Sequence, residues 1–178
     1  MTNPVLTLTT ERPAGLQRVA DALAAADHPH APVMLSDAAR TAQQAADALG
    51  VALGQIAKSI VFRLKNHPSG NDAAVLVITS GDLRVDEKKV QAIVCADGGK
   101  LGRADAEFVK AKTGFSIGGV SPLAHTTAPV TLIDRELFRF ATIWAAAGHP
   151  HGVFRLTPAE LQALTSAPVH DVTESPPA

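Results

Sequence analysis

The sequence predicts a mixed α/β fold of the α+β type, in which a mostly antiparallel, barrel-like mixed sheet is flanked by helices. Helical and strand patterns follow one another without strict β-α-β alternation, and two apolar runs flank a turn-forming cluster. With 178 residues, 46% of them hydrophobic, the chain is long enough to bury one core. We therefore expect a single domain over residues 1–178, with a globular part at about 10–165 and loose tails at 1–9 and 167–178.

The N-terminal part predicts two helices around a short strand. Apolar residues at helical spacing define the first helix, and Pro29 and Pro32 follow its end. Gly50 is the expected C-terminal stop of the second, alanine-rich helix. The expected bounds are 10 or 11 to about 27 for the first helix, 33–35 for the strand, and a cap at Ser36 or Asp37 with a helix to Leu49.

The two apolar runs are expected to pair as a hairpin. The first, Ser59–Leu64, is rich in β-branched and aromatic residues. The second, Ala73–Thr79, is apolar almost throughout, so both of its faces should be covered. Asn66–Asp72 between them is rich in turn-forming residues.

The C-terminal half predicts short helices and strands in irregular order. Thr157, Pro158 and Glu160 form a strong helix start, because Thr157 can cap the helix and Glu160 completes a capping box. Helices are expected at about 86–94 and 104–112 around a glycine-rich loop at 96–102, strands at 130–133, 142–146 and 153–156, and a helical turn at 135–137.

Composition excludes several classes of function. The net charge of −1 provides no global basic field, so we expect no DNA partner, and any RNA contact must be local. Cys95 is the only cysteine, which excludes an internal disulfide and a cysteine metal cluster. No apolar run approaches the roughly 18 residues needed to span a bilayer, and no signal peptide is apparent. We expect a cytoplasmic protein without a membrane partner.

Lys58 stands directly before the apolar run Ile60–Phe62. Lysine is rarely buried without a partner, and at a strand edge facing a cleft it offers a charge and three donors to an anion or a polarised carbonyl. The alternative is an ordinary strand lysine whose ammonium group reaches water.

Two glycine-containing loops are candidate binding elements. In Gly118-Gly119-Val120-Ser121-Pro122, paired glycines allow consecutive N–H groups to face an oxyanion or a phosphate; the alternative is a tight turn. The loop Gly148-His149-Pro150-His151 places two histidines after an apolar strand.

The histidines offer few metal-binding patterns. His149 is a candidate substrate contact, but no third ligand at a metal-binding spacing accompanies it, so no metal or other cofactor is expected. His30, beside Pro29, is included among the substrate-binding candidates, although an exposed loop is an equally simple interpretation.

Six basic residues form a loose set with two interpretations. They can be ordinary solvated helix faces or part of a local RNA contact, and the sequence does not show that they share a face. They are Lys88, Lys89, Lys100, Arg103, Lys110 and Lys112.

Three motifs in this order resemble the YbaK / prolyl-tRNA synthetase-associated editing-domain family. They are Gln-Ile-Ala-Lys58-Ser-Ile-Val-Phe, then Gly118-Gly119-Val-Ser-Pro122, then Ala-Ala-Gly148-His-Pro with a terminal Leu-Thr-Pro-Ala-Glu-Leu. The resemblance covers about residues 15–165. It implies a barrel-like mixed sheet and a free-standing aminoacyl-tRNA deacylase, without a metal, that removes a wrong small amino acid in trans, usually from tRNA for proline.

The resemblance also implies the roles of individual residues. Lys58, Gly118 and Gly119 would be catalytic, and hydrolysis would rely on the ribose 2′-hydroxyl or a reactive side chain of the substrate. Ser59, Ser121, Pro122, Gly148, His149 and His30 would bind the substrate. The partners implied are aminoacyl-tRNA and prolyl-tRNA synthetase.

The sequence departs from some family members. Where those have Ser-Ala-Gly-Arg-Arg-Gly, this chain has Ala-Ala-Gly148-His149-Pro150-His151, and it contains no tyrosine. The cysteine-specific branch is therefore disfavoured. Two alternatives stay open: a non-catalytic module of the same fold that binds aminoacyl-tRNA or a synthetase, and an esterase for small aminoacyl esters.

Overall fold

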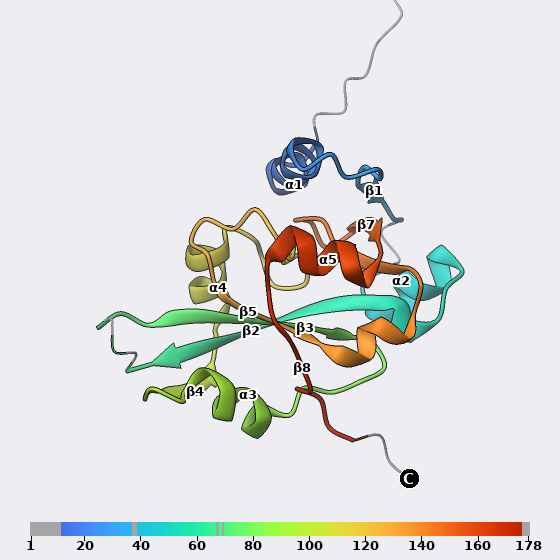
Figure 1. Cartoon of the computed structure of the whole chain (residues 1–178). Helices are drawn as coiled ribbons and strands as arrows, with labels where there is room; N and C mark the ends of the chain where they lie inside the picture. Colours follow the sequence, from blue (N-terminus) through green and yellow to red (C-terminus); the bar gives the residue numbers. More distant parts are fainter. Residues whose placement is uncertain (1–11, 37–38, 67, 69, 176–178) are drawn as a thin grey trace, which may run out of the picture.

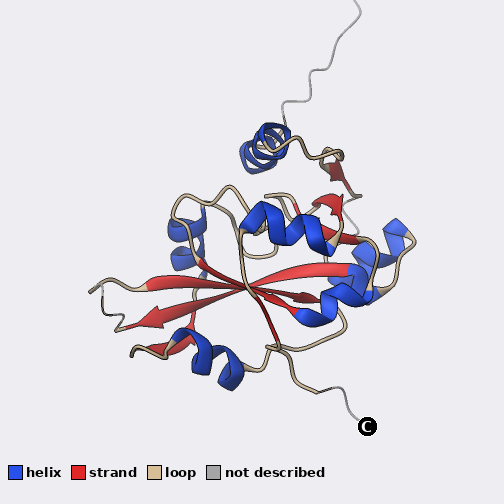
Figure 2. Ribbon diagram, viewed as in Figure 1, coloured by secondary structure: helices blue, strands red, loops and turns tan. Residues whose placement is uncertain are grey.

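A mixed sheet of eight strands lies at the centre of the computed structural model, which describes residues 12–36, 39–66, 68 and 70–175 (Figure 1). Helices cover both faces of this sheet (Figure 2). The helices are α1 Ala14–Ala25, α2 Ala42–Leu49, α3 Glu87–Val94, α4 Ala106–Thr113 and α5 Pro158–Thr165, with 3₁₀ turns at Leu53–Gln55 and Arg135–Arg139. The strands are β1 Val33–Met34, β2 Ile56–Lys65, β3 Ala73–Ser80, β4 Lys100–Arg103, β5 Val130–Asp134, β6 Ile143–Ala146, β7 Gly152–Leu156 and β8 Val169–His170.

The strand pairing confirms the mixed α/β class. The order is β1-β7-β6-β2-β3-β5-β8, and β4 pairs with the distal part of β2. Four pairings are antiparallel and three are parallel, so the antiparallel majority is narrow. The predicted hairpin is confirmed as β2 and β3, with Lys58 opposite Thr79 and Leu64 opposite Ala73.

Strand β3 is buried on both faces, as its apolar sequence predicts. Leu76 and Ile78 belong to the core cluster that contains residues of α1, α4 and α5. Val75 and Val77 belong to the cluster that contains α3. In Figure 1, α4 and α5 accordingly lie above the sheet and α3 below it. The alternation of these residues between two cores fixes the register of β3.

Helix α2 starts later than the sequence analysis predicted. Its N-cap is Thr41, whose hydroxyl accepts from Gln44 N–H, while the Gln44 side chain accepts from Thr41 N–H. Ser36, one of the two predicted caps, lies outside the helix, and Asp37 lies outside the described residues. The capping box explains the shift, because it satisfies two donors at once. Gly50 ends the helix in the left-handed region, as predicted.

Two further boundaries differ from prediction. The first helix begins at Ala14 after Pro13, so residues 12 and 13 are not helical; the predicted start at 10 or 11 lies outside the described residues. The glycine-rich loop predicted at 96–102 overlaps β4, in which Lys100–Arg103 pair with the end of β2. Sheet pairing there overrides the low strand propensity of glycine.

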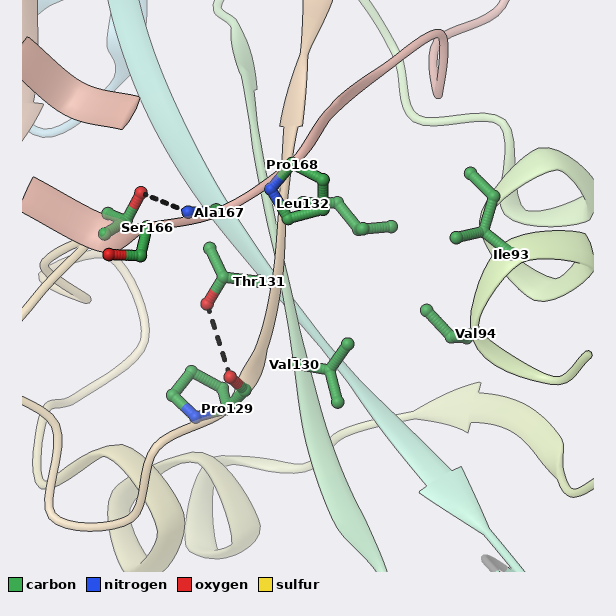
Figure 3. A pocket seen from close by; sticks show the side chains of 10 residues that line it. Ile93, Val94, Pro129, Val130, Thr131, Leu132, Ser166, Ala167 and Pro168 are labelled. Atoms are coloured by element: carbon green, nitrogen blue, oxygen red, sulfur yellow. Dashed lines mark hydrogen bonds between the residues drawn. The ribbon is translucent and has the colours of Figure 1, made fainter. Parts of the chain in front are cut away.

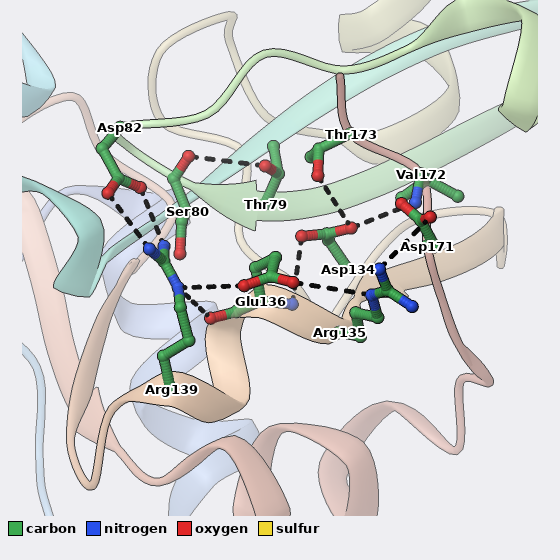
Figure 4. Close-up of polar contacts among 10 residues, drawn as sticks. All are labelled: Thr79, Ser80, Asp82, Asp134, Arg135, Glu136, Arg139, Asp171, Val172 and Thr173. Carbon is green, nitrogen blue, oxygen red and sulfur yellow. Dashed lines mark hydrogen bonds and ion pairs between the residues drawn. The ribbon is translucent and has the colours of Figure 1, made fainter. Parts of the chain in front are cut away.

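The C-terminal segment packs against the sheet, although residues from 167 onward were expected to be loose. Strand β8 pairs with Ile133 and Asp134 of β5, and Val172 is fully buried. Asp134 accepts hydrogen bonds from Val172 N–H at 3.0 Å and from the Thr173 hydroxyl at 3.3 Å (Figure 4). The prediction is therefore wrong for 167–175, because one buried carboxylate anchors a segment that looks unstructured by composition. Residues 1–9 lie outside the described part of the chain.

Among the described residues, no helix combines the length and apolar character that crossing a membrane requires.

Candidate active site

Strand β2 has an open edge midway along its length. On one side, β3 pairs with it continuously from Ala57 to Leu64. On the other side, β6 pairs only with Ile56 and Ala57, and β4 only with residues 62–65. Among the described strands, none covers this edge between residues 58 and 61.

The register directs the main chain of Ser59 toward this open edge. Gly81 N–H donates to Ile56 O at 2.7 Å, and hydrogen-bonding residues alternate along an antiparallel pair. The main-chain groups of Lys58 and Ile60 therefore point toward β3, and those of Ser59 point away from it. The Ser59 hydroxyl oxygen is also buried without a hydrogen-bond partner among the described residues. Buried polar groups are usually paired, so an unpaired hydroxyl beside an open strand edge and a cavity is a candidate binding site.

A cavity of about 330 Å³ opens at this edge. Its walls come from β2, α2, the glycine loop at 117–120, and strands β6 and β7. Ile60, Ile117 and Trp144 make it largely apolar. The ionisable side chains that line it, within the described chain, are Arg40 and Lys58, and both are cations.

Lys58 lies in β2, where it also borders a more open hollow of about 400 Å³ that contains Arg84. Burial lowers the pKa of Lys58 below the ordinary lysine value of 10.5. The negative charge of Asp82 partly opposes this, and the positive charge of Arg84 adds to it. Lys58 forms none of the ion pairs found among the described residues, so its ammonium group is not committed to a structural carboxylate.

The two predicted glycine loops meet at the rim of the cavity. A Cβ atom on Gly119 would lie 2.8 Å from the carbonyl carbon of His149 and 2.9 Å from Pro150 N, so only glycine permits this approach. Gly118 has a φ of +89° and lines the cavity, where a Cβ would meet nothing within 4 Å. The structure thus joins two motifs about 30 residues apart in the sequence.

Gly148 and His149 lie behind this rim. Gly148, with a φ of +82°, packs against the backbone of Gly15 at the start of α1. His151 N–H donates to His149 Nδ1 at 3.1 Å, so the proton of a neutral His149 ring is on Nε2. Pro150 and Gly152 of the same segment line the cavity, whereas Gly148 and His149 do not.

Ser121 supports the glycine loop from inside the protein, and Pro122 beside it is buried. Ser121 is fully buried, and its carbonyl oxygen lies 2.6 Å from Nε2 of His125. Burial lowers the pKa of His125 below 6.5, partly opposed by the hydrogen bond to Ser121, while nearby Arg18 lowers it further. A neutral His125 therefore donates its Nε2–H to Ser121 O and positions the loop.

The predicted site residues fall into three groups. Lys58, Ser59 and Gly118 line the cavity, Gly119, Ser121, Gly148 and His149 support its wall, and Pro122 is buried next to Ser121. His30 is exposed and lies beside His28, with ring centroids 5.9 Å apart. It does not line the cavity, so its role in substrate binding stays a prediction.

Helix α2 and Trp144 contribute to the cavity, although no sequence motif indicated either of them. Ala42 and Ala45 form part of the wall, and the spacing of these small residues on one helix face is the signal that was available. Arg40, just before α2, is a second cation at the cavity that no motif indicated.

Two other hollows are poorer candidates. The hollow of about 440 Å³ between α3 and the edge of β5 has no ionisable side chain in its lining (Figure 3). The hollow of about 250 Å³ beside β8 is rich in charges, but its principal charges form ion pairs (Figure 4). No group of three or more potential metal ligands gathers anywhere in the described chain.

Comparison with known proteins identifies relatives of this chain. The model of the aminoacyl-tRNA editing domain matches residues 36–164. The uncharacterized protein YwhH of Bacillus subtilis (strain 168) is 34% identical over 129 residues, which are 72% of this chain and 77% of that protein.

Solved structures agree with this match. One, described as a proposed trans-editing enzyme for prolyl tRNA synthetase, is 39% identical with a TM-score of 0.83, over 92% of this chain and 99% of that one. Another, from work on epitope backbone grafting onto scaffold proteins, is 38% identical with a TM-score of 0.83, over 92% and 100% of the two chains. The predicted resemblance is therefore confirmed, and the chain belongs to the aminoacyl-tRNA editing domain family, the YbaK family.

Proposed function

We propose that this protein is an aminoacyl-tRNA deacylase that acts in trans in the cytoplasm, hydrolysing the ester of tRNA for proline that carries a wrong small amino acid. The observation that supports this most is the position of Lys58, an ammonium group outside the ion pairs of the described chain, at an apolar cavity beside the open edge of β2. The family match and the description of the relative with 39% identity support the same activity and substrate class.

Ester hydrolysis needs stabilisation of the charge that develops on the carbonyl oxygen. Attack of water on the ester carbonyl gives a tetrahedral intermediate with a negative oxygen, and collapse of this intermediate releases the amino acid and the ribose hydroxyl. Lys58 and the main-chain N–H of Ser59 are donors at the cavity suited to that oxygen. Removing one such donor typically costs about 10²–10³ in rate.

The cavity supports charge stabilisation better than proton removal. Its ionisable lining residues within the described chain, Arg40 and Lys58, are both cations, and neither a histidine nor a carboxylate lines it. We therefore assign Lys58 to the oxyanion and assign proton transfer to solvent and the ribose 2′-hydroxyl of the substrate.

The walls of the cavity supply selectivity by size. Ile60, Ile117 and Trp144 favour a small apolar side chain and restrict a larger one. One methylene group discriminates only about 10–200-fold in a hydrophobic pocket, so a synthetase gains from a second site that clears its errors.

The test is deacylation of tRNA for proline charged separately with alanine, cysteine, serine and proline. Wild type and Lys58→Ala are compared, with and without prolyl-tRNA synthetase. We expect one mischarged species to be cleared, prolyl-tRNA to be spared, and the variant to lose about 10²-fold or more.

Other outcomes would contradict the proposal. Binding of tRNA without clearance of any species would indicate a non-catalytic binding module. Hydrolysis of small aminoacyl esters without activity on tRNA would indicate an esterase of a different substrate class.

A further inference from the structure

We propose that four basic residues, Arg63, Lys65, Lys100 and Lys112, form a surface that binds the phosphate backbone of the tRNA near its aminoacylated end. We call this surface the basic face. The proposal rests on the proposed function, because it assigns the part of the protein that holds the RNA while the ester occupies the cavity.

The four side chains come from three elements but share one side of the sheet. Arg63 and Lys65 are two apart on β2, so they point to the same face. Lys65 is the direct cross-strand partner of Lys100 on β4, which places Lys100 there as well. Helix α4 covers this face, since the guanidinium of Arg63 lies 4.7 Å from the centroid of the Phe108 ring and Lys112 Nζ lies 6.0 Å from it. The end of β2, β4 and α4 accordingly gather on the left of Figure 1.

The pairing of Lys65 with Lys100 is unfavourable for folding. Like charges directly opposite each other on one face of an antiparallel pair are destabilising. Gly102, the β4 partner of Arg63, has no side chain that could separate these charges. The Lys65 side chain extends over Gly102, since a Cβ added to Gly102 would lie 3.6 Å from Lys65 Nζ. A ligand with closely spaced negative charges would relieve the repulsion.

The positive charges of the basic face are only partly neutralised by acidic residues of the protein. Asp72 pairs with Arg63 at 2.7 Å, but the ion pairs of the described residues include none with Lys65, Lys100 or Lys112. Other lysines of the basic set have structural roles, because Lys89 pairs with Asp171 and Lys110 donates to Gly114 O. Within the loose basic set of the sequence, Lys89 and Lys110 therefore have structural contacts, whereas Lys100 and Lys112 remain available on the basic face.

The basic face is continuous with the candidate active site. Ser59 and Val61 precede Arg63 and Lys65 on the same face of β2, and they line a hollow of about 150 Å³ together with Gly118. At about 3.3 Å per residue, Lys65 lies roughly 20 Å along the strand from Ser59. RNA phosphates held here would lie on the same strand face that leads to the open edge.

The experiment measures the salt dependence of binding of uncharged tRNA for proline to the full chain. Each phosphate contact contributes to the slope of log K against log salt, so Lys65→Ala, Lys100→Ala and Lys112→Ala should each reduce its magnitude by about 0.7–0.9. In deacylation of mischarged tRNA, we expect KM to rise about threefold to tenfold, with little change in kcat. Lys88→Ala is the matched control, because Lys88 is exposed on α3, which covers the other face of the sheet.

Lys100→Glu separates an RNA contact from a structural role. It places a carboxylate opposite Lys65, so the melting temperature should stay the same or rise, while tRNA affinity should fall tenfold or more. A fall in melting temperature with unchanged affinity would overturn the proposal.

Two further outcomes would overturn the assignment of the basic face to RNA, and the first of them leaves the proposed function intact. If wild type clears mischarged tRNA while the alanine variants keep the wild-type salt slope and KM, the basic face is wrong and the function stands. If the variants lose binding to an acidic peptide such as polyglutamate as strongly as to tRNA, and the salt slopes for tRNA do not change, the surface binds an acidic protein and the RNA assignment is wrong.

Discussion

The open edge of β2 and the cluster around Asp134 are two polar regions that differ in whether their polar groups have hydrogen-bond partners. Asp134 is fully buried, and it accepts from Glu136 N–H, Val172 N–H and the Thr173 hydroxyl. Around it, Arg139 pairs with Asp82 and Glu136 (Figure 4). At the open edge, the Ser59 hydroxyl has no partner among the described residues, and Lys58 joins none of their ion pairs.

This difference separates a structural polar cluster from a candidate active site. A buried network that is fully satisfied fixes the packing around it, whereas unpaired polar groups cost stability unless a ligand completes them. The Asp134 cluster should therefore matter for folding and little for hydrolysis. Lys58 should matter for hydrolysis and little for folding.

The largest expected loss of stability follows from Asp134→Ala. It leaves Val172 N–H and the Thr173 hydroxyl without their acceptor, and hydrogen bonds to a charged group contribute about 1.5–3 kcal/mol each. We expect the free energy of unfolding to fall by about 3 kcal/mol or more in urea denaturation. Asp134→Asn keeps one acceptor and should lose less. A loss below about 1 kcal/mol for the alanine variant would show that the cluster does not anchor the C-terminal segment.

The next effect concerns the contact between the two loops. Gly119→Ala forces a Cβ against the backbone of His149 and Pro150, and inserting an atom into a packed site costs about 1–3 kcal/mol. Because the rim of the cavity must open, deacylation should also fall, which kinetics and denaturation together can measure. Normal activity in a variant of normal stability would refute the role of this contact.

Gly118→Ala is expected to have a smaller effect on stability, with a close control. Gly118 and Gly70 have φ values of +89° and +85°, and a Cβ added at either position would meet no atom within 4 Å. Each alanine variant should lose about 1 kcal/mol, because positive φ is unfavourable for alanine. Only Gly118→Ala should reduce deacylation. Equal activities would mean that the Gly118 backbone has no role at the cavity.

The pH dependence of hydrolysis should show the smallest shifts. Because burial lowers the pKa of Lys58, activity that needs the ammonium form should be lost at an alkaline pH below 10.5. Asp82→Asn removes a charge that raises this pKa, so the alkaline limb should move to lower pH; Arg84→Ala should move it to higher pH. The limbs are measured as enzymatic rates after subtraction of the uncatalysed hydrolysis. If both variants moved the alkaline limb in the same direction, Lys58 would be excluded as the titrating group.

His125 offers a separate titration in the support of the glycine loop. Since its pKa is lowered on folding, its contribution to stability is present above 6.5 and is lost as the pH falls below that value, where the unfolded chain binds the proton. An NMR titration should find the His125 ring still neutral at a pH where exposed histidines are half protonated. Titration at or above 6.5 would contradict its buried role.

Periodicity and capping chemistry predicted much of the fold. The residues of α1 that face the core, the apolar strand β3 and the capping box of α5 all follow local rules that the structure confirms. The C-terminal strand could not be found in this way, because a single long-range anchor, Asp134, holds β8 and Val172. Composition alone does not contain that contact.

The candidate site was predictable in its motifs but not in its geometry. The chemistry of Lys58 and Gly118 makes both of them candidates in the sequence, and in the structure both line one cavity. The open edge of β2 depends on where β6 and β4 stop pairing, which no local pattern encodes. His30 lies outside the lining of this cavity for a related reason, since its neighbourhood is set by the packing of His28 near α5.

The most direct test compares Lys58→Met with wild type in single-turnover deacylation, with the free energy of unfolding measured on the same samples. Methionine keeps the apolar stem of lysine and removes its charge. We expect the rate constant to fall about 10²-fold or more, with stability unchanged or slightly increased because a half-buried charge is gone. A rate within threefold of wild type, or a loss of rate that follows a loss of folding stability, would contradict the role of Lys58 in stabilising the oxyanion.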